Sequence, residues 1–95
     1  MRVPPEVRAY KRTDTFTEET VPKGLLRAHS TKDGVWGLIH VLEGRLAYRV
    51  RDPGRPASDQ VLSVEDEPGV VEPTILHEVE PLGPVRFYVE FLRAG

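Results

Sequence analysis

The sequence predicts an all-β domain, a small antiparallel sandwich or barrel. About eight short apolar segments are separated by turn-forming residues at intervals of roughly six to twelve positions. No segment keeps a helical period over roughly ten residues. A parallel α/β fold needs alternating helices and strands, so it is excluded. The motifs G-x-G-x-x-G and G-K-[ST] are also absent, which excludes a dinucleotide or P-loop site.

The length and composition limit the classes of protein that remain. With 95 residues the chain forms one domain, for which we expect an extended N-terminal arm over residues 1–23 and a barrel core over residues 24–95. The net charge is -2 and the 13 basic residues are scattered, which argues against a nucleic-acid partner. There is no cysteine, and no apolar run is long enough for a signal peptide or a membrane span. We therefore expect a cytoplasmic protein with no membrane partner.

The first third of the chain is predicted to be extended. Prolines and β-branched threonines oppose a helix in residues 1–23, although one helical turn is possible over residues 17–20. Residues 7–11 are expected to pair at a sheet edge or to lie over the mouth of the barrel. Residues 24–29 are predicted to form a strand, and the Asp-Gly pair at 33–34 is a strong hairpin signal.

The middle of the chain is predicted to form a hairpin. Residues 35–43 form one strand, Gly44 turns the chain, and residues 45–51 alternate polar and apolar side chains with a period of two. That alternation places three apolar side chains on the inner face: Leu46, Tyr48 and Val50. Residues 52–56 contain two prolines and a glycine and are therefore a loop.

The last third is predicted to contain four strands. Residues 60–64 are followed by an acidic turn, then come one strand before Pro73 and one that begins at His77. Residues 82–84 form another turn. Residues 85–92 close the chain with four apolar side chains on one face: Val85, Phe87, Val89 and Phe91.

A candidate metal site spans this region. Glu72 and His77 are five residues apart on either side of the bend at Pro73, and carboxylate with neutral imidazole suits a divalent metal. His29 is the best third ligand. His40 is its rival, but strand parity places His40 opposite the face of Gly37, so we expect it outside the site.

Several blocks of the sequence resemble the cupin superfamily. The resemblance is closest to the small cupin-like domain found at the N-terminus of tellurite-resistance protein B and in free-standing relatives. It rests on five blocks: His29-Ser30-Thr31-Lys32, Val35-Trp36-Gly37, Val41-Leu42-Glu43-Gly44-Arg45-Leu46, Glu72-Pro73 and His77-Glu78-Val79-Glu80. It implies a jelly-roll barrel with a metal held inside by His29, Glu72 and His77. Tellurite-resistance protein B also carries a methyltransferase domain, so these 95 residues are expected not to methylate a substrate by themselves.

The predicted site leaves the function open between two classes. The first is a metal-binding module in which a divalent ion, zinc foremost with iron or nickel as alternatives, also binds a small molecule or oxyanion in a tellurite- or stress-resistance context. The second is a metal-dependent enzyme, such as a dioxygenase or isomerase, acting on a small molecule. Four further side chains are possible pocket residues: Lys32, Trp36, Tyr88 and Glu90. The open edges of a small sandwich predict a homodimer.

Overall fold

Two long strands, β3 (Trp36–Val50) and β6 (His77–Ala94), organise the fold of the computed structural model, which describes residues 2–95. They pair antiparallel along almost their whole length, from Trp36 opposite Leu92 to Val50 opposite His77. Four shorter strands flank them: β1 (Val7–Arg12), β2 (Phe16–Thr17), β4 (Ser58–Ser63) and β5 (Gly69–Val71). The prediction of an all-β antiparallel fold is confirmed.

Both long strands bend where the sequence predicted turns. Gly44 has a φ of +76° and Gly83 a φ of +110°, and the β3–β6 pairing shifts register on both sides of Gly44. These features are bulges, which bend a strand without ending it. The predicted turns at Gly44 and at residues 82–84 are therefore wrong, since each falls inside one continuous strand. Whether a glycine ends or bends a strand depends on the partner strand opposite it.

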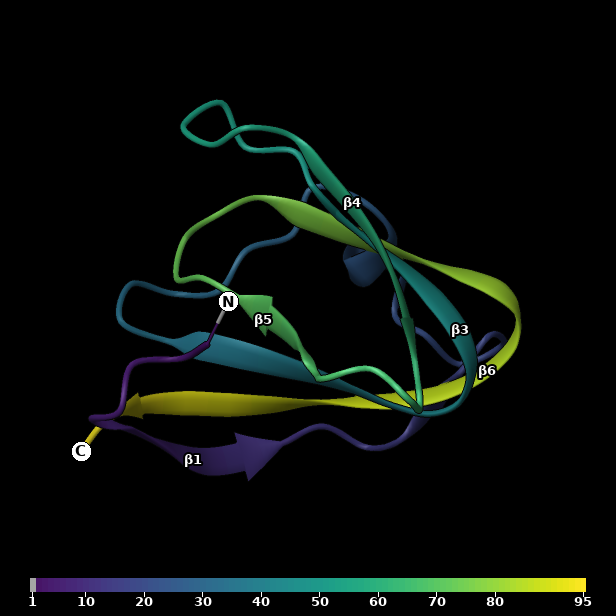
Figure 1. The fold of residues 1–95 in the computed structure, drawn as a ribbon, viewed down its shortest axis with the longest axis horizontal. Coiled ribbons are helices and arrows are strands. Elements are labelled where there is room, and N and C mark those ends of the chain that lie inside the picture. Colours follow the sequence, from purple (N-terminus) through teal and green to yellow (C-terminus); the bar gives the residue numbers. More distant parts are fainter. Residues whose placement is uncertain (1) are drawn as a thin grey trace.

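The bends fold the sheet over itself into two facing layers (Figure 1). In one layer β1 and β5 flank the first half of β3 and the last half of β6, and in the other layer β4 flanks the second half of β3. The path β1–β6–β3–β4 stays open, because within residues 2–95 the two end strands are not paired with each other. The expected closed barrel is therefore not formed.

The hydrophobic core lies between these layers. Its largest fully buried side chains are Phe87, Ile39, Leu46 and Val85. Leu46 and Tyr48 are buried, as the period-two alternation predicted, while Val50 is only half-buried and packs against the core. The inward face of the last strand is also confirmed, because Phe87 and Val85 are buried and Val89 and Phe91 are half-buried on the same side.

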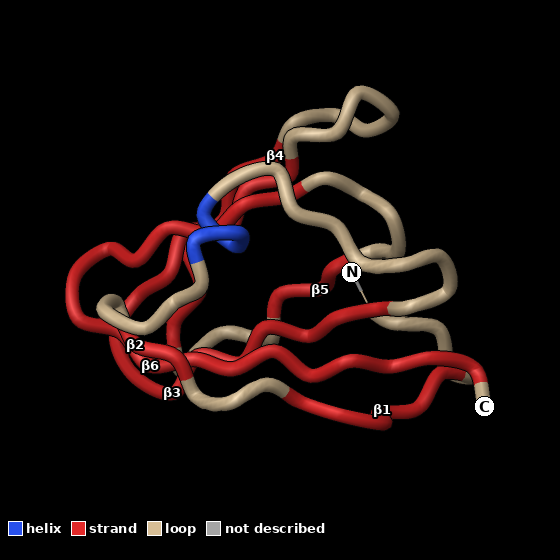
Figure 2. The backbone as a smooth tube through the Cα atoms, turned by 180° about the vertical axis from the view of Figure 1, so that it is seen from behind, coloured by secondary structure: helices blue, strands red, loops and turns tan. Residues whose placement is uncertain are grey.

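The segment before β3 differs from its prediction. Residues 24–29 were expected to form a strand, but the chain forms a short 3₁₀ helix, η1 (Lys23–Leu26), and only His29 makes a β-bridge. Pro22 presets the first turn with a φ of -60°, and its carbonyl accepts a hydrogen bond from the amide of Leu25. Figure 2 shows this helix beside the loops that cover one side of the sheet. No helix in the described chain has the length and apolar character to cross a membrane.

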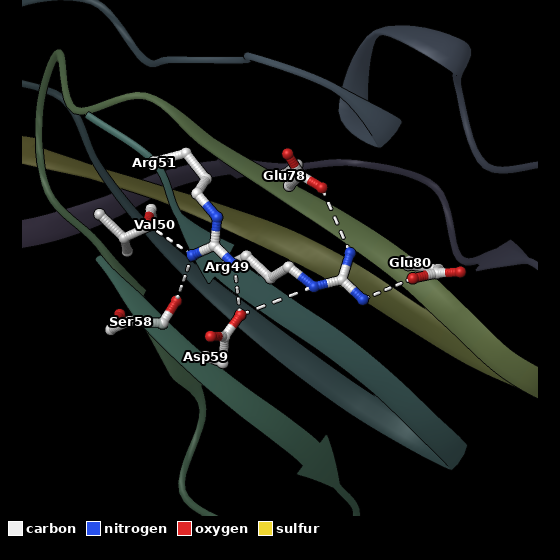
Figure 3. Close-up of polar contacts among 7 residues, drawn as sticks. All are labelled: Arg49, Val50, Arg51, Ser58, Asp59, Glu78 and Glu80. Carbon is white, nitrogen blue, oxygen red and sulfur yellow. Dashed lines mark hydrogen bonds and ion pairs between the residues drawn. The ribbon is translucent and has the colours of Figure 1, made fainter. Parts of the chain in front are cut away.

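The outer face of the second layer carries a charged network centred on Arg49 of β3 (Figure 3). Its guanidinium contacts Glu78 at 3.2 Å and Glu80 at 2.5 Å on β6, and Asp59 at 3.7 Å on β4. Arg51 binds the same Asp59 at 2.6 Å. The contacts join three strands on their solvated face, where each ion pair adds little stability but favours this register.

Candidate functional site

His29 and His77 meet at the start of β6, as the sequence predicted. Each donates its amide hydrogen to the carbonyl of the other, at 2.8 and 2.9 Å, which is a hydrogen-bonded antiparallel pair. The pairing places both side chains on one face, and the rings lie 5.4 Å apart in an edge-to-face arrangement with an interplanar angle of 87°. His29 and His77, which are 48 positions apart in the sequence, thus form one small site.

The two rings face a cavity of about 250 Å³ between the layers. Aliphatic and aromatic side chains make up most of its wall, with Ile39 and Val79 from the core, Phe16 from β2 and Leu25 from η1. Its polar side chains are the two histidines with Thr13 and Thr31, and none of the lining residues within positions 2–95 is charged. The site is therefore an apolar cavity with two imidazoles at its wall.

The environment of His77 sets which of its ring nitrogens is free. Only 4% of His77 is exposed, and burial lowers the pKa of its imidazole, with a smaller contribution from His29; the hydrogen bond to Ile75 acts in the opposite direction. Nδ1 lies 3.2 Å from the carbonyl oxygen of Ile75. Because a carbonyl oxygen only accepts, Nδ1 carries the hydrogen and Nε2 of the neutral ring has a lone pair.

The two threonine hydroxyls of the cavity are already engaged. Thr31 Oγ1 donates to the carbonyl of Val35 at 2.7 Å. Thr13 Oγ1 donates to the carbonyl of Asp14 at 2.8 Å and accepts the amide of Val89 at 3.0 Å. Both hydroxyl hydrogens are therefore donated within the protein, and the threonines can offer a ligand only the remaining lone pairs of their oxygens.

Glu72 lies elsewhere. Its Oε2 accepts hydrogen bonds from Nη2 of Arg55 at 2.5 Å and from Nε at 3.2 Å. It lines a second, larger cavity of about 650 Å³, which also includes Tyr48 and the edge strand β4. The hydroxyl of Tyr48 donates to the carbonyl of Val70 at 2.8 Å, and its ring lies edge-on to that of His77 at 5.7 Å. The structure unites the two predicted histidines and pairs the predicted glutamate with Arg55 instead.

The remaining predicted residues lie outside the histidine cavity. Lys32 is exposed in its turn, and Trp36 is half-buried opposite Leu92 at the start of β3. Tyr88 and Glu90 form a separate cluster with His40, which stacks on Tyr88 at 4.7 Å and contacts Glu90 through Nε2 at 3.0 Å.

Sequence reasoning missed the covering wall of the cavity. Phe16 comes from a proline- and threonine-rich stretch without a clear period, so no local signal assigned it to the inside, and Leu25 lies in η1, where a strand was expected. Ile75 was missed as well, although its position two residues before His77 is where a bend returns a carbonyl toward the ring. The period-two pattern did predict that Tyr48 points inward, where its ring contacts that of His77.

Comparison with known proteins gives the family. Residues 11–89 match the model of the TehB-like domain. The chain is 32% identical over 78 residues to a probable S-adenosyl-L-methionine-dependent methyltransferase TehB of Haemophilus influenzae strain Rd, and 31% identical to that of strain 10810. Each match covers 81% of this chain but 27% of the relative, so the chain spans about a quarter of these curated relatives.

Two solved structures share the fold. The crystal structure of TehB from H. influenzae superposes with a TM-score of 0.86 at 26% identity, over 95% of this chain and 32% of that one. A protein from E. coli strain K12 superposes with the same TM-score at 20% identity, over 100% of this chain and 98% of that one. The second likeness shows the fold alone, on a chain of nearly the same extent.

These findings correct the predicted metal function. The relatives are named as methyltransferases that depend on S-adenosyl-L-methionine, not as metal-binding cupins. Within residues 2–95 no three His, Asp or Glu side chains are grouped to hold a metal ion, and the carboxylate of Glu72 is paired with Arg55. The predictions of a metal-binding cupin, of a divalent cofactor and of metal-dependent catalysis are therefore wrong. The match over residues 11–89 shows that this chain belongs to the TehB-like domain family.

Proposed function

We propose that this chain serves S-adenosyl-L-methionine-dependent methyl transfer as a domain that binds a small molecule in the cavity of His29 and His77. The cavity is the observation that carries the proposal, because it is a largely apolar space with few polar groups beside the hydrophobic core. Small-molecule sites have this character, with mostly apolar walls and a few polar atoms that orient the ligand.

The family relationship supports the link to methyl transfer. The matched part of the TehB relatives is about a quarter of their length, and in this chain it is an all-β unit. We assign the binding of S-adenosyl-L-methionine to the rest of such proteins and the binding of a second small molecule to this domain. The two facing layers, joined through the bends of β3 and β6, support a jelly-roll-like fold whose sheet is open at its edges.

The size of the cavity supports a single-ring ligand. An apolar cavity of about 150 Å³ is enough to hold benzene, and this cavity has about 250 Å³. A ring with a few additional atoms fits that space. Benzene is therefore a suitable neutral probe for occupancy of the cavity.

Benzene titration of the ¹⁵N-labelled chain tests the binding function. We expect saturable shifts at amides along the cavity wall, such as those of Ile39 and Val79. Val89→Phe fills the cavity and should weaken benzene binding by about tenfold or more. Val64→Phe is the matched control, because Val64 is 64% exposed and does not line this cavity. No saturable shifts, or unchanged binding in Val89→Phe, would overturn the proposal.

The assignment of the S-adenosyl-L-methionine site to another part of such proteins is tested with S-adenosyl-L-methionine itself. Millimolar S-adenosyl-L-methionine should leave the spectrum of the same sample unchanged and produce no heat of binding. Saturable binding of S-adenosyl-L-methionine to this chain would show that the donor site lies in the β domain, contrary to the proposed assignment.

A further inference from the structure

We infer that the cavity selects a small apolar molecule with one hydroxyl or thiol group, whose hydrogen is donated to Nε2 of His77. This inference rests on the proposed function and specifies the chemical class of the ligand. It follows from the direction of each hydrogen bond at the cavity wall, taken together with the absence of charge among the lining residues described above.

Nε2 of His77 has a free lone pair. Nδ1 of His77 is held by the carbonyl of Ile75, so Nε2 of the neutral ring can only accept. Within residues 2–95, every side-chain nitrogen or oxygen that is completely enclosed has a hydrogen-bond partner. Nε2 has no partner there, although His77 is only 4% exposed, so it must open onto the cavity. An acceptor facing an apolar cavity favours a ligand that brings a donor.

The apolar wall of the cavity limits which donor group can bind there. An ammonium or carboxylate group would place a charge among aliphatic and aromatic side chains without a counter-ion, which is costly. A hydroxyl or thiol is neutral, and its oxygen or sulfur also accepts a hydrogen bond. His29, whose ring lies 5.4 Å from that of His77, carries a ring N–H that it can donate to the same atom. One X–H group thus satisfies both imidazoles.

A hydroxyl or thiol ligand also fits the chemistry of methyl transfer. An oxygen or sulfur that carries a hydrogen is a methyl acceptor: a bond forms between this atom and the methyl carbon, the bond from that carbon to the donor sulfonium breaks, and the hydrogen leaves as a proton. The lone pair of His77 Nε2 lies where it can hold that proton. In this role His77 positions and polarises the group while the donor is bound by another part of the system.

Three matched probes test the inference: benzene, phenol and anisole. Phenol is better hydrated than benzene, so apolar burial alone does not favour it. Anisole keeps the oxygen attached to the ring but lacks the hydroxyl hydrogen. We expect phenol to bind on the order of tenfold more tightly than anisole or benzene. Equal affinities would overturn the inference and leave the proposed function intact, whereas binding of none of the three would refute the proposed function as well.

Variants locate the source of the preference. His77→Phe keeps a ring of similar size, so it should still bind benzene but lose the preference for phenol. His40→Phe is the matched control, since His40 pairs with Glu90 outside the cavity, and it should retain the preference. Long-range ¹H–¹⁵N spectra of the imidazoles give a second readout. A hydrogen found on Nε2 of His77 instead of Nδ1 would overturn the inference even if phenol binds.

Discussion

Gly44 of β3 lies directly against the carbonyl oxygen of Pro84 in β6. A Cβ built on Gly44 would be 2.0 Å from that oxygen, and the φ of +76° is one that other residues rarely adopt. The two long strands can bend together only because this position has no side chain. The folding of the sheet into two layers, and with it the cavity between them, depends on that close approach.

Substitution of Gly44 should therefore be far more damaging than substitution at a comparable turn. We expect Gly44→Ala to lower the free energy of unfolding by about 3 kcal/mol or more, because it adds a backbone clash to the strain of a positive φ. Gly34 has the same φ of +76° but open space around it, so Gly34→Ala should cost only about 1 kcal/mol. Urea unfolding measures both, and equal losses would contradict the role given to Pro84.

Tyr48 should make the protein less stable at high pH. Burial, with a smaller contribution from the charge of Glu72, raises the pKa of Tyr48 from 10.0 to about 12. The folded state therefore favours the neutral phenol, and this stabilisation is complete below pH 10.0 and is lost as pH rises toward about 12.

Tyr48→Phe is the control for this titration. It removes the ionisable group, so its free energy of unfolding should fall less steeply than that of the unchanged protein over the same pH range. Optical titration should also show one tyrosine with a pKa of about 12. Parallel stability curves for the two proteins would argue against a buried Tyr48 phenol.

Asp52 should contribute to loss of stability in acid. Its carboxylate accepts hydrogen bonds from the amides of Leu76 at 3.0 Å and Gly54 at 2.8 Å, and these bonds lower its pKa below the ordinary value of 3.8. Since the folded pKa is lower, the stabilisation is present above the unfolded pKa and is lost as pH falls through the folded one. Thermal unfolding of Asp52→Asn between roughly pH 6 and pH 3 should depend less on pH than that of the unchanged protein. The exposed Asp33→Asn variant should behave like the unchanged protein.

The bridge between His29 and His77 should protect an amide that lies outside the named strands. The amide of His29 donates to His77 at 2.8 Å, so its hydrogen should exchange with solvent slowly. The neighbouring Ser30 is exposed and donates no backbone hydrogen bond within residues 2–95, so its amide should exchange rapidly. Hydrogen exchange followed by NMR compares the two directly. Equally fast exchange would mean that the bridge opens readily and that the wall of the cavity is not held closed by it.

Local patterns in the sequence determined the fold class and the faces of the strands. The alternation around Leu46 and Tyr48 and along Val85, Phe87 and Val89 predicted which side chains point inward, because successive residues of a strand point to opposite faces whatever lies beyond them. The meeting of His29 with His77 was also predicted.

Only the tertiary structure decided how the strands continue and what surrounds the histidines. Gly44 and Gly83 bend their strands because each lies opposite a partner that keeps pairing, and that partner is distant in the sequence. Glu72 accepts a hydrogen bond from Arg55, 17 residues away, because the folded loops place the Arg55 guanidinium beside its carboxylate. These outcomes depend on contacts between residues far apart in the chain, whereas periodicity reports only on neighbours.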